Sequence, residues 1–188
     1  MIMQQKVKEK TYKQMLWVSM ISMTMMFAGL TSAYVVSKNR EDWVSFDLPS
    51  SFYISTLLIV ISSLTFYLAK RFIKNNDTSK TSLFLIITLL LGVGFVYFQF
   101  QGFKQLIEAG LYFTGKESNV STSFLYVITI SHLAHILAGI VVLSTVLIQN
   151  IRGKYSATNS LGLELGAIFW HFVDALWIYL FLFFYFIG

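Results

Sequence analysis

The sequence predicts an all-α integral membrane protein, a bundle of five transmembrane helices with a cytoplasmic N-terminus and a periplasmic C-terminus. Of its 188 residues, 56% are hydrophobic and only 12% are charged, whereas about 25% of the residues in soluble domains are charged. Five apolar runs are each long enough to cross a hydrocarbon core of about 30 Å at ~1.5 Å per residue. They must be helical, because a backbone in lipid needs internal partners for all its polar groups. The runs are Met15–Ser37, Phe52–Ile73, Thr81–Gln101, Thr122–Gln149 and Leu163–Ile187.

The predicted domain organisation is simple. Residues 1–14 form a cytoplasmic N-terminal tail and residues 15–188 form one five-helix domain, because the connecting loops are too short to hold a folded unit. Pro49 stands just before the second run, where a missing N–H costs nothing. The NNDTSK stretch before the third run is typical of a helix cap. Apolar residues at helical spacing predict that the third helix extends beyond its run, through Phe103, Leu106, Ile107 and Leu111.

The orientation follows from the distribution of lysine and arginine. Assigning the N-terminal tail and the second and fourth loops to the cytoplasm puts ten of the 14 basic residues inside, while Lys38, Arg40, Lys104 and Lys116 lie outside. Cytoplasmic loops carry an excess of Lys and Arg in membrane proteins. This distribution accounts for the net charge of +5 and leaves no basic–aromatic cluster for a nucleic acid. The chain has no cysteine, which excludes disulfides, thiolate metal sites, iron–sulfur clusters and a thiol nucleophile.

Small residues within three of the runs predict close helix contacts. Small side chains let helix backbones approach one another, and helix association in lipid depends on such packing. We therefore expect a compact bundle in which helices touch at these positions. They are Ala28, Gly29, Ser32 and Ala33 in the first run, Gly92 and Gly94 in the third, and Ala134, Ala138 and Gly139 in the fourth.

Four ionisable side chains lie inside the predicted spans, away from their ends. His132 and His135 are three residues apart in the fourth run, and His171 and Asp174 are three apart in the fifth. The helical rise places the first pair about 15 and 20 Å from the outer end of its helix, and the second pair about 10 and 15 Å from the inner end. An unpaired charge at such depth costs at least ~2.5–3.5 kcal/mol. The four side chains are therefore expected to be paired, neutral or in a polar cavity.

Three interpretations of this set remain open from the residues alone. The two pairs together offer four ligands for a metal, since side chains three apart share one helix face. They also suit a proton relay or the binding of a transported ion, although no Gly- or Pro-interrupted pair of spans accompanies them. In the third interpretation they form one interhelical polar cluster, and their hydrogen bonds fix the register of the bundle or anchor a lipid headgroup. Spacing alone favours the third.

Several motifs resemble subunit III of the haem-copper cytochrome c oxidases. In the fifth run, FWHFVDALWIYLF is similar to the family's W-H-F-V-D-x-x-W, with Trp170, His171, Asp174 and Trp177 in place. In the fourth, TISHLAHILAG resembles T-G-x-H-G-x-H-V-x-x-G and keeps Thr129, His132, His135 and Gly139. In the first, MMFAGLTSAY resembles M-F-F-A-G-L-F-S-A-Y. In the second, the run ISTLLIVISSLT after Leu48 and Pro49 also fits.

The resemblance implies the short, five-helix bacterial form of subunit III in the cytoplasmic (inner) membrane. It implies a non-catalytic accessory subunit, with haem and copper held by subunits I and II and no metal or other redox cofactor held by this chain. The implied partners are those two subunits and membrane phospholipids. The implied roles are assembly, lipid binding, oxygen access and sustained proton uptake by subunit I during the transfer of electrons from cytochrome c to oxygen. Trp170, Trp177 and Gly139 are then expected to serve packing or lipid contact.

The sequence departs from the family pattern at three places. Met23 stands where the family commonly has a glutamate, Gln99 and Gln101 stand in a stretch that is often acidic, and Leu133 replaces a glycine. Methionine cannot ionise, so these changes favour scaffolding over proton handling. Two alternatives are kept beside the main interpretation. One is a subunit III-like component of a nitric oxide reductase system, and the other is a proton-coupled transporter or intramembrane metalloprotein that uses the His/Asp set directly.

Overall fold

The structure, a computed structural model, describes residues 2–41, 43–44, 46–115, 118–157 and 159–188. Lys116 of the charge count and the first residue of the predicted tail lie outside these ranges. The described part of the chain forms five helices, each long and apolar enough to span a membrane, and no strand. Each helix contains one of the predicted runs, so the predicted fold class is confirmed. The helices are α1 (Ile2–Ser37), α2 (Ser50–Lys74), α3 (Thr78–Glu108), α4 (Val120–Ile151) and α5 (Leu161–Ile187).

The helix boundaries follow local signals in the sequence. Pro49 is the N-cap of α2, and its carbonyl accepts a hydrogen bond of 3.0 Å from the N–H of Phe52. Asp77 caps α3 by accepting from the backbone N–H of Lys80 at 3.1 Å. The Lys80 ammonium also pairs with this carboxylate at 2.8 Å, so the pKa of Asp77 lies below its usual range. α3 continues to Glu108, which confirms the predicted extension as far as Ile107, whereas Leu111 lies beyond the end of the helix.

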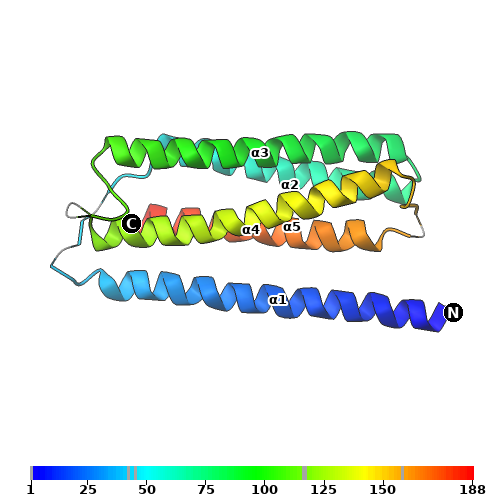
Figure 1. Ribbon diagram of the computed structural model, residues 1–188, viewed down its shortest axis with the longest axis horizontal. Coiled ribbons are helices and arrows are strands. Elements are labelled where there is room, and N and C mark those ends of the chain that lie inside the picture. The colour runs from blue at the N-terminus through cyan, green and yellow to red at the C-terminus, as the bar shows by residue number, and fades with distance from the viewer. Residues whose placement is uncertain (1, 42, 45, 116–117, 158) are drawn as a thin grey trace.

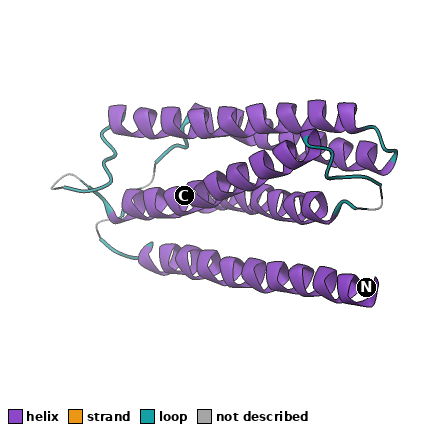
Figure 2. Ribbon diagram, turned by 45° about the vertical axis from the view of Figure 1, so that its right-hand side comes forward, coloured by secondary structure: helices purple, strands orange, loops and turns teal. Residues whose placement is uncertain are grey.

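Helices α2 to α5 form the main body of the bundle, and α1 runs along one side of it (Figure 1). α2 and α3 share the most extensive helix–helix contact, α5 packs against α2 and α4, and α1 contacts only α4 and α5 among the described residues. The separate course of α1 is visible again in the turned view of Figure 2. The N- and C-termini lie at opposite ends of the long axis (Figure 1), as an odd number of spans requires. Which end faces the cytoplasm remains a prediction.

α1 is held to α5 at three levels. At the N-terminal end of the bundle, Lys13 Nζ donates to Glu164 at 3.0 Å. Farther along, the hydroxyls of Thr31 and Tyr179 share a hydrogen bond of 3.1 Å. Near the other end, Lys38 Nζ donates to the backbone carbonyl of Ile187 at 2.6 Å. Between these contacts α1 buries a narrow apolar seam, formed by Met20, Phe27 and Tyr34.

The predicted small-residue contacts are present at Gly92 and Gly94 of α3 and at Gly139 of α4. They are absent at Ala134 and Ala138 of α4, which are exposed, and on α1. A Cβ atom at Gly92 would lie 2.7 Å from the Trp170 ring, and one at Gly139 would lie 3.2 Å from the same ring. On α1, a Cβ at Gly29 would meet no atom within 4 Å. The other small residues of that helix are also exposed, so the expectation of a contact there within this chain is wrong. They are Ala28, Ser32 and Ala33.

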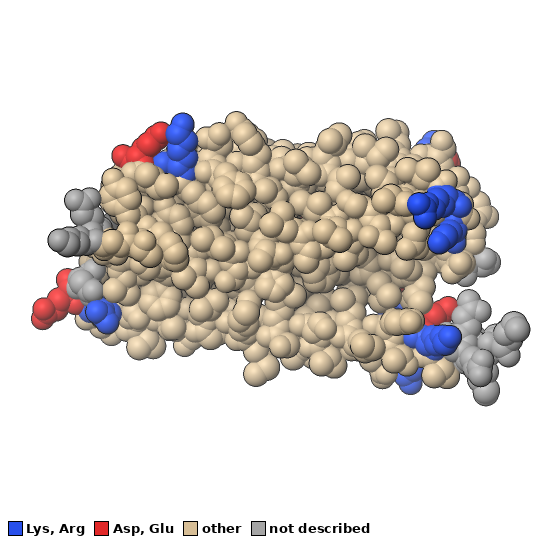
Figure 3. Space-filling model, in the orientation of Figure 1, with Lys and Arg blue, Asp and Glu red and all other residues tan. Residues whose placement is uncertain are grey.

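The surface has the polarity of a membrane-spanning bundle. On the face shown in Figure 3, acidic and basic side chains gather at the two ends of the long axis, and the broad surface between them carries none. Large apolar side chains are exposed in the middle parts of the helices, for example Leu57 and Leu64 of α2 and Leu90 of α3. In water such a continuous apolar surface would be an aggregation liability, whereas lipid tails cover it without cost.

Candidate functional site

The residues singled out on α5 occupy its buried face. Trp170, Asp174 and Trp177 are one or two helical turns apart and are 1%, 2% and 0% exposed. His171 lies beside them and is half-buried. α5 carries this face into the centre of the bundle because it packs against α1, α2 and α4 at once. The two tryptophans therefore pack inside the protein and do not face lipid.

Trp170 fills a slot between α3 and α4. Gly92 of α3 and Gly139 of α4 bring their backbones against its ring, and a side chain at either position would intrude on the indole. The indole Nε1–H then donates to the Ser62 hydroxyl of α2 at 3.0 Å. A buried indole N–H needs such a partner, because an unmatched donor in an apolar interior is costly. One side chain of α5 thus contacts three other helices.

Trp177 repeats this arrangement two turns farther along α5. Its Nε1–H donates to the Thr56 hydroxyl of α2 at 2.9 Å. Its ring meets Phe95 of α3 edge-on, at a centroid distance of 5.2 Å, and lies 5.1 Å from the imidazole of His132 on α4. Edge-to-face aromatic pairs at such distances add stabilisation beyond area burial. Trp177 is the second side chain that joins α2, α3 and α4 through α5.

His171 and Asp174 both face α2. The Ser63 hydroxyl and His171 Nδ1 share a hydrogen bond of 2.6 Å, and the ring of Phe66 lies 6.0 Å from the imidazole. Ser63 also lies within electrostatic reach of the Asp174 carboxyl, but without the geometry of a hydrogen bond. Neither carboxyl oxygen of Asp174 has a hydrogen-bond partner among the described residues. The bundle therefore buries the carboxyl of Asp174 without a hydrogen bond from any described residue.

The two histidines of α4 have different surroundings. His132 is 1% exposed, neither of its ring nitrogens has a described hydrogen-bond partner, and the rings of Phe27, Phe95 and Trp177 surround it. His135 is half-buried. Its Nδ1 donates to the Ser131 carbonyl one turn earlier, at 2.7 Å, and its ring faces Phe27 of α1. His132 thus belongs to the aromatic core, whereas His135 lies at the α1–α4 contact.

The register of α4 and α5 spreads the predicted set over nearly two helical turns along the bundle. The two helices are antiparallel neighbours, with Gly139 opposite Trp170 and His132 beside Trp177. Half-way between these contacts, His135 is level with Asp174. No hydrogen bond joins any two members of the set, which comprises His132, His135, His171 and Asp174. The described residues also include no group of three or more His, Cys, Asp or Glu side chains placed to hold a metal. The interhelical hydrogen bond that is present, at His171, goes to α2 instead of α4.

The hydroxyl groups of α2 are the residues that sequence reasoning missed. Two adjacent pairs of hydroxyl residues in α2, Ser55–Thr56 and Ser62–Ser63, are seven residues apart. Seven residues are about two helical turns, the same interval that separates the two tryptophans of α5. This shared spacing in α2 and α5 is the sequence pattern that could have identified the hydroxyls as partners of the tryptophans. The remaining hydroxyl contacts join α2 to α3, where the Thr65 and Thr88 hydroxyls share a bond of 2.8 Å and Gln99 Nε2 donates to Ser55 at 2.9 Å.

The positions that depart from the family pattern also have defined surroundings. Met23 is partly buried and packs against the apolar core. Gln99 is fully buried on α3; its amide nitrogen bonds Ser55, and its carbonyl oxygen has no described partner. Gln101, by contrast, is half-buried and donates to Tyr97 OH at 3.0 Å on the outer side of the same helix. Leu133 is buried in the core, so its side chain occupies space that a glycine would leave open.

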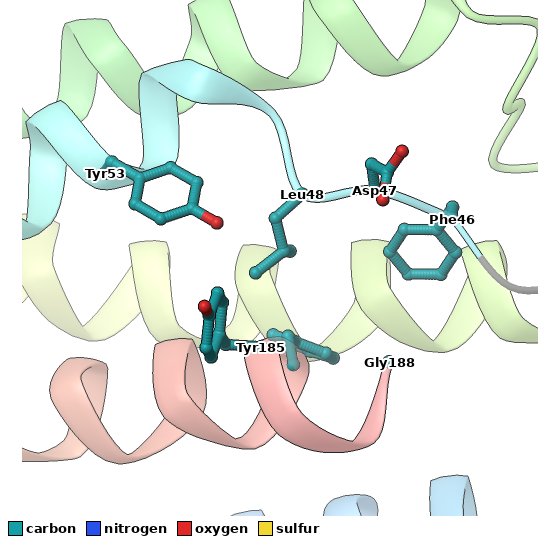
Figure 4. Close-up of a pocket in the computed structure, with 7 residues that line it drawn as sticks. Phe46, Asp47, Leu48, Tyr53, Tyr185 and Gly188 are labelled. Atoms are coloured by element: carbon teal, nitrogen blue, oxygen red, sulfur yellow. The ribbon is translucent and has the colours of Figure 1, made fainter.

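Two hollows border α5. A cavity of about 540 Å³ lies between α1 and the α4–α5 pair and is lined mostly by apolar groups, including Leu16, Val142, Leu165 and Phe169. A second hollow, of about 370 Å³, lies at the C-terminal end of the bundle. There Tyr53 of α2 and Tyr185 of α5 lie on one side and Asp47 on the other (Figure 4). Tyrosines are typical of the membrane–water interface, so this end has the character of an interfacial belt.

Comparison with known proteins agrees with this architecture. Residues 5–188 match the family described as Cytochrome c oxidase subunit III. The chain is 28% identical over 177 residues to cytochrome c oxidase subunit 3 of Bacillus sp. (strain PS3), covering 92% of this chain and 84% of that protein. It is 30% identical over 178 residues to cytochrome c oxidase subunit 3 of Bacillus subtilis (strain 168), with the same coverage, and 27% identical over 171 residues to quinol oxidase subunit 3 of that organism, covering 88% of this chain and 81% of the relative.

The match extends through all five helices, and the relatives are bacterial proteins. Together with the five apolar helices, it makes this a multi-pass bacterial membrane protein that assembles with other subunits. The chain belongs to the cytochrome c oxidase subunit III family.

Proposed function

We propose that this chain is the accessory subunit III of a bacterial haem-copper terminal oxidase that passes electrons from cytochrome c to oxygen, and that it has no redox centre of its own. One observation carries the proposal. The indole and imidazole groups of the α5 signature bond hydroxyls of α2 at Trp170, His171 and Trp177. These polar groups are thereby engaged in joining helices. Of the set that looked suited to metal or proton chemistry, His171 is thereby engaged in joining α5 to α2, which supports a role in the packing of the bundle.

The proposed partners are subunits I and II of the oxidase, with subunit I in direct contact. α1 offers the best candidate surface for that contact. It is the helix with the smallest buried share of its span, 17%, and Ala28, Gly29, Ser32 and Ala33 are exposed on it. Exposed small residues let a helix of another chain approach closely. In the proposed orientation the N-terminus of α1 lies in the cytoplasm.

The cavity between α1 and the α4–α5 pair supports the lipid-binding part of the proposal. Its volume of about 540 Å³ and its apolar lining suit an acyl chain of a phospholipid, and its polar lining residues include Gln149 and Tyr155, whose side chains bond each other at 3.0 Å. An apolar space inside the membrane also admits oxygen, which is the proposed route by which this subunit supplies subunit I. Support of proton uptake would then act through subunit I, since Met23 offers no titratable group.

A quinol oxidase is the second candidate for the parent complex. The quinol oxidase relative is 27% identical to this chain and the cytochrome c oxidase relative from the same organism is 30% identical. Subunit III in this proposal makes no contact with the electron donor, so its sequence is free to be similar in both complexes. Both relatives are named for oxidases, which favours an oxidase over a nitric oxide reductase system.

The test is purification of the tagged chain from its native membrane in mild detergent. We expect larger haem-bearing chains to co-purify, the haem spectrum to follow their amount, and the preparation to consume oxygen with reduced cytochrome c. Oxidation of a quinol instead would favour the second candidate, and reduction of nitric oxide would favour the reductase system. A chain that purifies alone, with one metal ion per chain or with proton-coupled flux in vesicles, would overturn the proposal.

A further inference from the structure

The last two turns of α2 carry a basic surface around a hollow. Tyr67, Lys70, Arg71 and Lys74 are spaced at helical intervals, so they share one side of the helix. These four residues line a hollow of about 300 Å³. It lies at the end of the bundle where α1 begins, one of the two ends at which charged side chains gather (Figure 3). We call it the α2 basic hollow.

The three cations of the α2 basic hollow have no ion-pair partner among the described residues, unlike others at this end. Lys13 pairs with Glu164 at 3.0 Å, and Lys80 pairs with Asp77 at 2.8 Å. The charges of Lys70 and Lys74 also act on Glu164, but the hydrogen bond to that carboxylate comes from Lys13. The hollow therefore keeps an excess of positive charge that no ion pair among the described residues neutralises.

Two general tendencies explain why cations stand at this end of α2, but not why they surround a hollow. Cations are favoured at helix C-termini by the helix dipole, and they are favoured in cytoplasmic loops. Neither tendency requires three of them to share one side with a tyrosine hydroxyl. An anion with several oxygen acceptors would use all four groups at once, because ammonium, guanidinium and phenol groups are all donors.

The surface beyond the hollow indicates the source of that anion. Toward the middle of the membrane, the same side of α2 continues with exposed apolar side chains, Leu64, Ile61 and Leu57, which are 60%, 40% and 62% exposed. A phospholipid would place its phosphate among the cations and its acyl chains along these residues. A soluble phosphate would leave that apolar track unused. Basic pockets at the cytoplasmic ends of membrane helices are suited to anionic headgroups.

We propose that Lys70, Arg71, Lys74 and Tyr67 form a binding site for the phosphate of an anionic phospholipid whose tails lie along Leu64 and Ile61 of α2. This site is separate from the cavity beside α1, and it deepens the lipid-binding part of the proposed function, on which it rests. The shared chemistry is a phosphate group, and the experiment below distinguishes a lipid headgroup from free phosphate.

The test is native mass spectrometry of the purified complex after exchange into nanodiscs of phosphatidylglycerol or phosphatidylcholine, with lipids counted on this chain after its release. The variant Lys70→Gln/Arg71→Gln/Lys74→Gln removes the three cations of the α2 basic hollow. The control Lys10→Gln/Arg152→Gln/Lys154→Gln removes three from loops and helix ends elsewhere at the same end of the bundle. Each basic residue near an anionic membrane surface strengthens lipid binding about fivefold. The first variant should therefore retain phosphatidylglycerol about a hundredfold less strongly than the unmodified chain.

We expect the control to retain phosphatidylglycerol as the unmodified chain does, and retention of phosphatidylcholine to be low in all three proteins. Equal loss in the control would overturn the site, since it would reduce binding to total charge. Displacement of the lipid by millimolar inorganic phosphate would identify a free-phosphate site instead and overturn the lipid assignment. If the triple variant is not recovered, two other measurements test the site. Lys70→Arg/Lys74→Arg must retain phosphatidylglycerol as the unmodified chain does, and each single Gln variant must retain it about fivefold less strongly.

Failure of this inference and failure of the proposed function give different readings. The lipid count is taken from the mass of this chain, whereas membership of an oxidase is read from the haem spectrum of the co-purified chains. A haem-bearing complex whose subunit III retains no phosphatidylglycerol would overturn only the lipid site. A chain without haem-bearing partners that still retains the lipid would overturn only the oxidase assignment.

Discussion

The indole N–H of Trp170 on α5 donates a hydrogen bond of 3.0 Å to the hydroxyl of Ser62 on α2, and both residues are buried. The Ser62 hydroxyl in turn donates to the Ile59 carbonyl within α2 at 2.9 Å. The contact thus ties a side chain of one helix into the backbone of another. Together with the bond from Trp177 to Thr56, it sets the antiparallel register of α2 and α5.

A double-mutant cycle measures this contact. We expect Trp170→Phe and Ser62→Ala each to destabilise the chain, and the pair to show a coupling of about 0.6–2 kcal/mol, the range for hydrogen bonds between membrane helices. The measurement is unfolding of the purified chain in mixed micelles. Ser144→Ala is the control for Ser62→Ala, because among the described residues Ser144 bonds only the Ile140 carbonyl of its own helix. Its cycle with Trp170→Phe should show no coupling.

The approach of α3 to the Trp170 ring gives a second prediction. Because a Cβ at Gly92 would lie 2.7 Å from that ring, Gly92→Ala forces the indole or the backbone to move and should destabilise the bundle by about 1–3 kcal/mol. Gly29→Ala is the matched control, since its Cβ would meet nothing within 4 Å. There the better helix propensity of alanine should stabilise α1 by up to about 1 kcal/mol. Thermal unfolding in detergent separates the two, and equal effects would contradict the packing argument.

Much of the fold could be predicted because the membrane restricts the possibilities. Run length and the need to satisfy every backbone group determine five helices, and the cap at Asp77 is a local signal. The partner of each polar side chain could not be predicted in this way. The sequence position of His171 and of His132 gives the depth of each side chain along its helix, but the rotation of the helix decides which neighbour each one faces. The structure turns His171 toward Ser63 of α2 and leaves His132 among aromatic rings.

The small residues of α1 show the same limit from another side. The sequence predicts helix contacts at small residues of α1 and also at Gly92 and Gly139; those of α1 are Ala28, Gly29, Ser32 and Ala33. Only the second group meets another helix of this chain. Composition identifies a surface suited to close packing, but it does not say whether the helix that packs there belongs to the same chain or to a partner subunit.

Asp174 provides a third prediction, which separates an accessory subunit from a transporter. The carboxyl has no described hydrogen-bond partner, so Asp174→Asn replaces one enclosed polar group by another of similar shape and should change stability by less than about 1 kcal/mol. We expect the initial rate of oxygen consumption by the complex to stay unchanged, while turnover over many cycles declines sooner, because the substitution alters the contact beside Ser63 and His171. Oxygen-electrode traces over short and long times measure both. Loss of the initial rate would contradict the accessory role.

The exposed small-residue surface of α1 provides the last prediction, and the absence of cysteine from the sequence makes the measurement direct. A single cysteine introduced as Ser32→Cys should react with a short bifunctional cross-linker to give a product with subunit I, because a small-residue surface admits a second helix at close range. Leu57→Cys on α2 is the control. Leu57 is 62% exposed, but it lies on a helix surface of large apolar side chains that we assign to lipid, so its cross-linking yield should be low. Preferential cross-linking from Leu57→Cys would place subunit I against α2 and would also leave no room for the phospholipid proposed there.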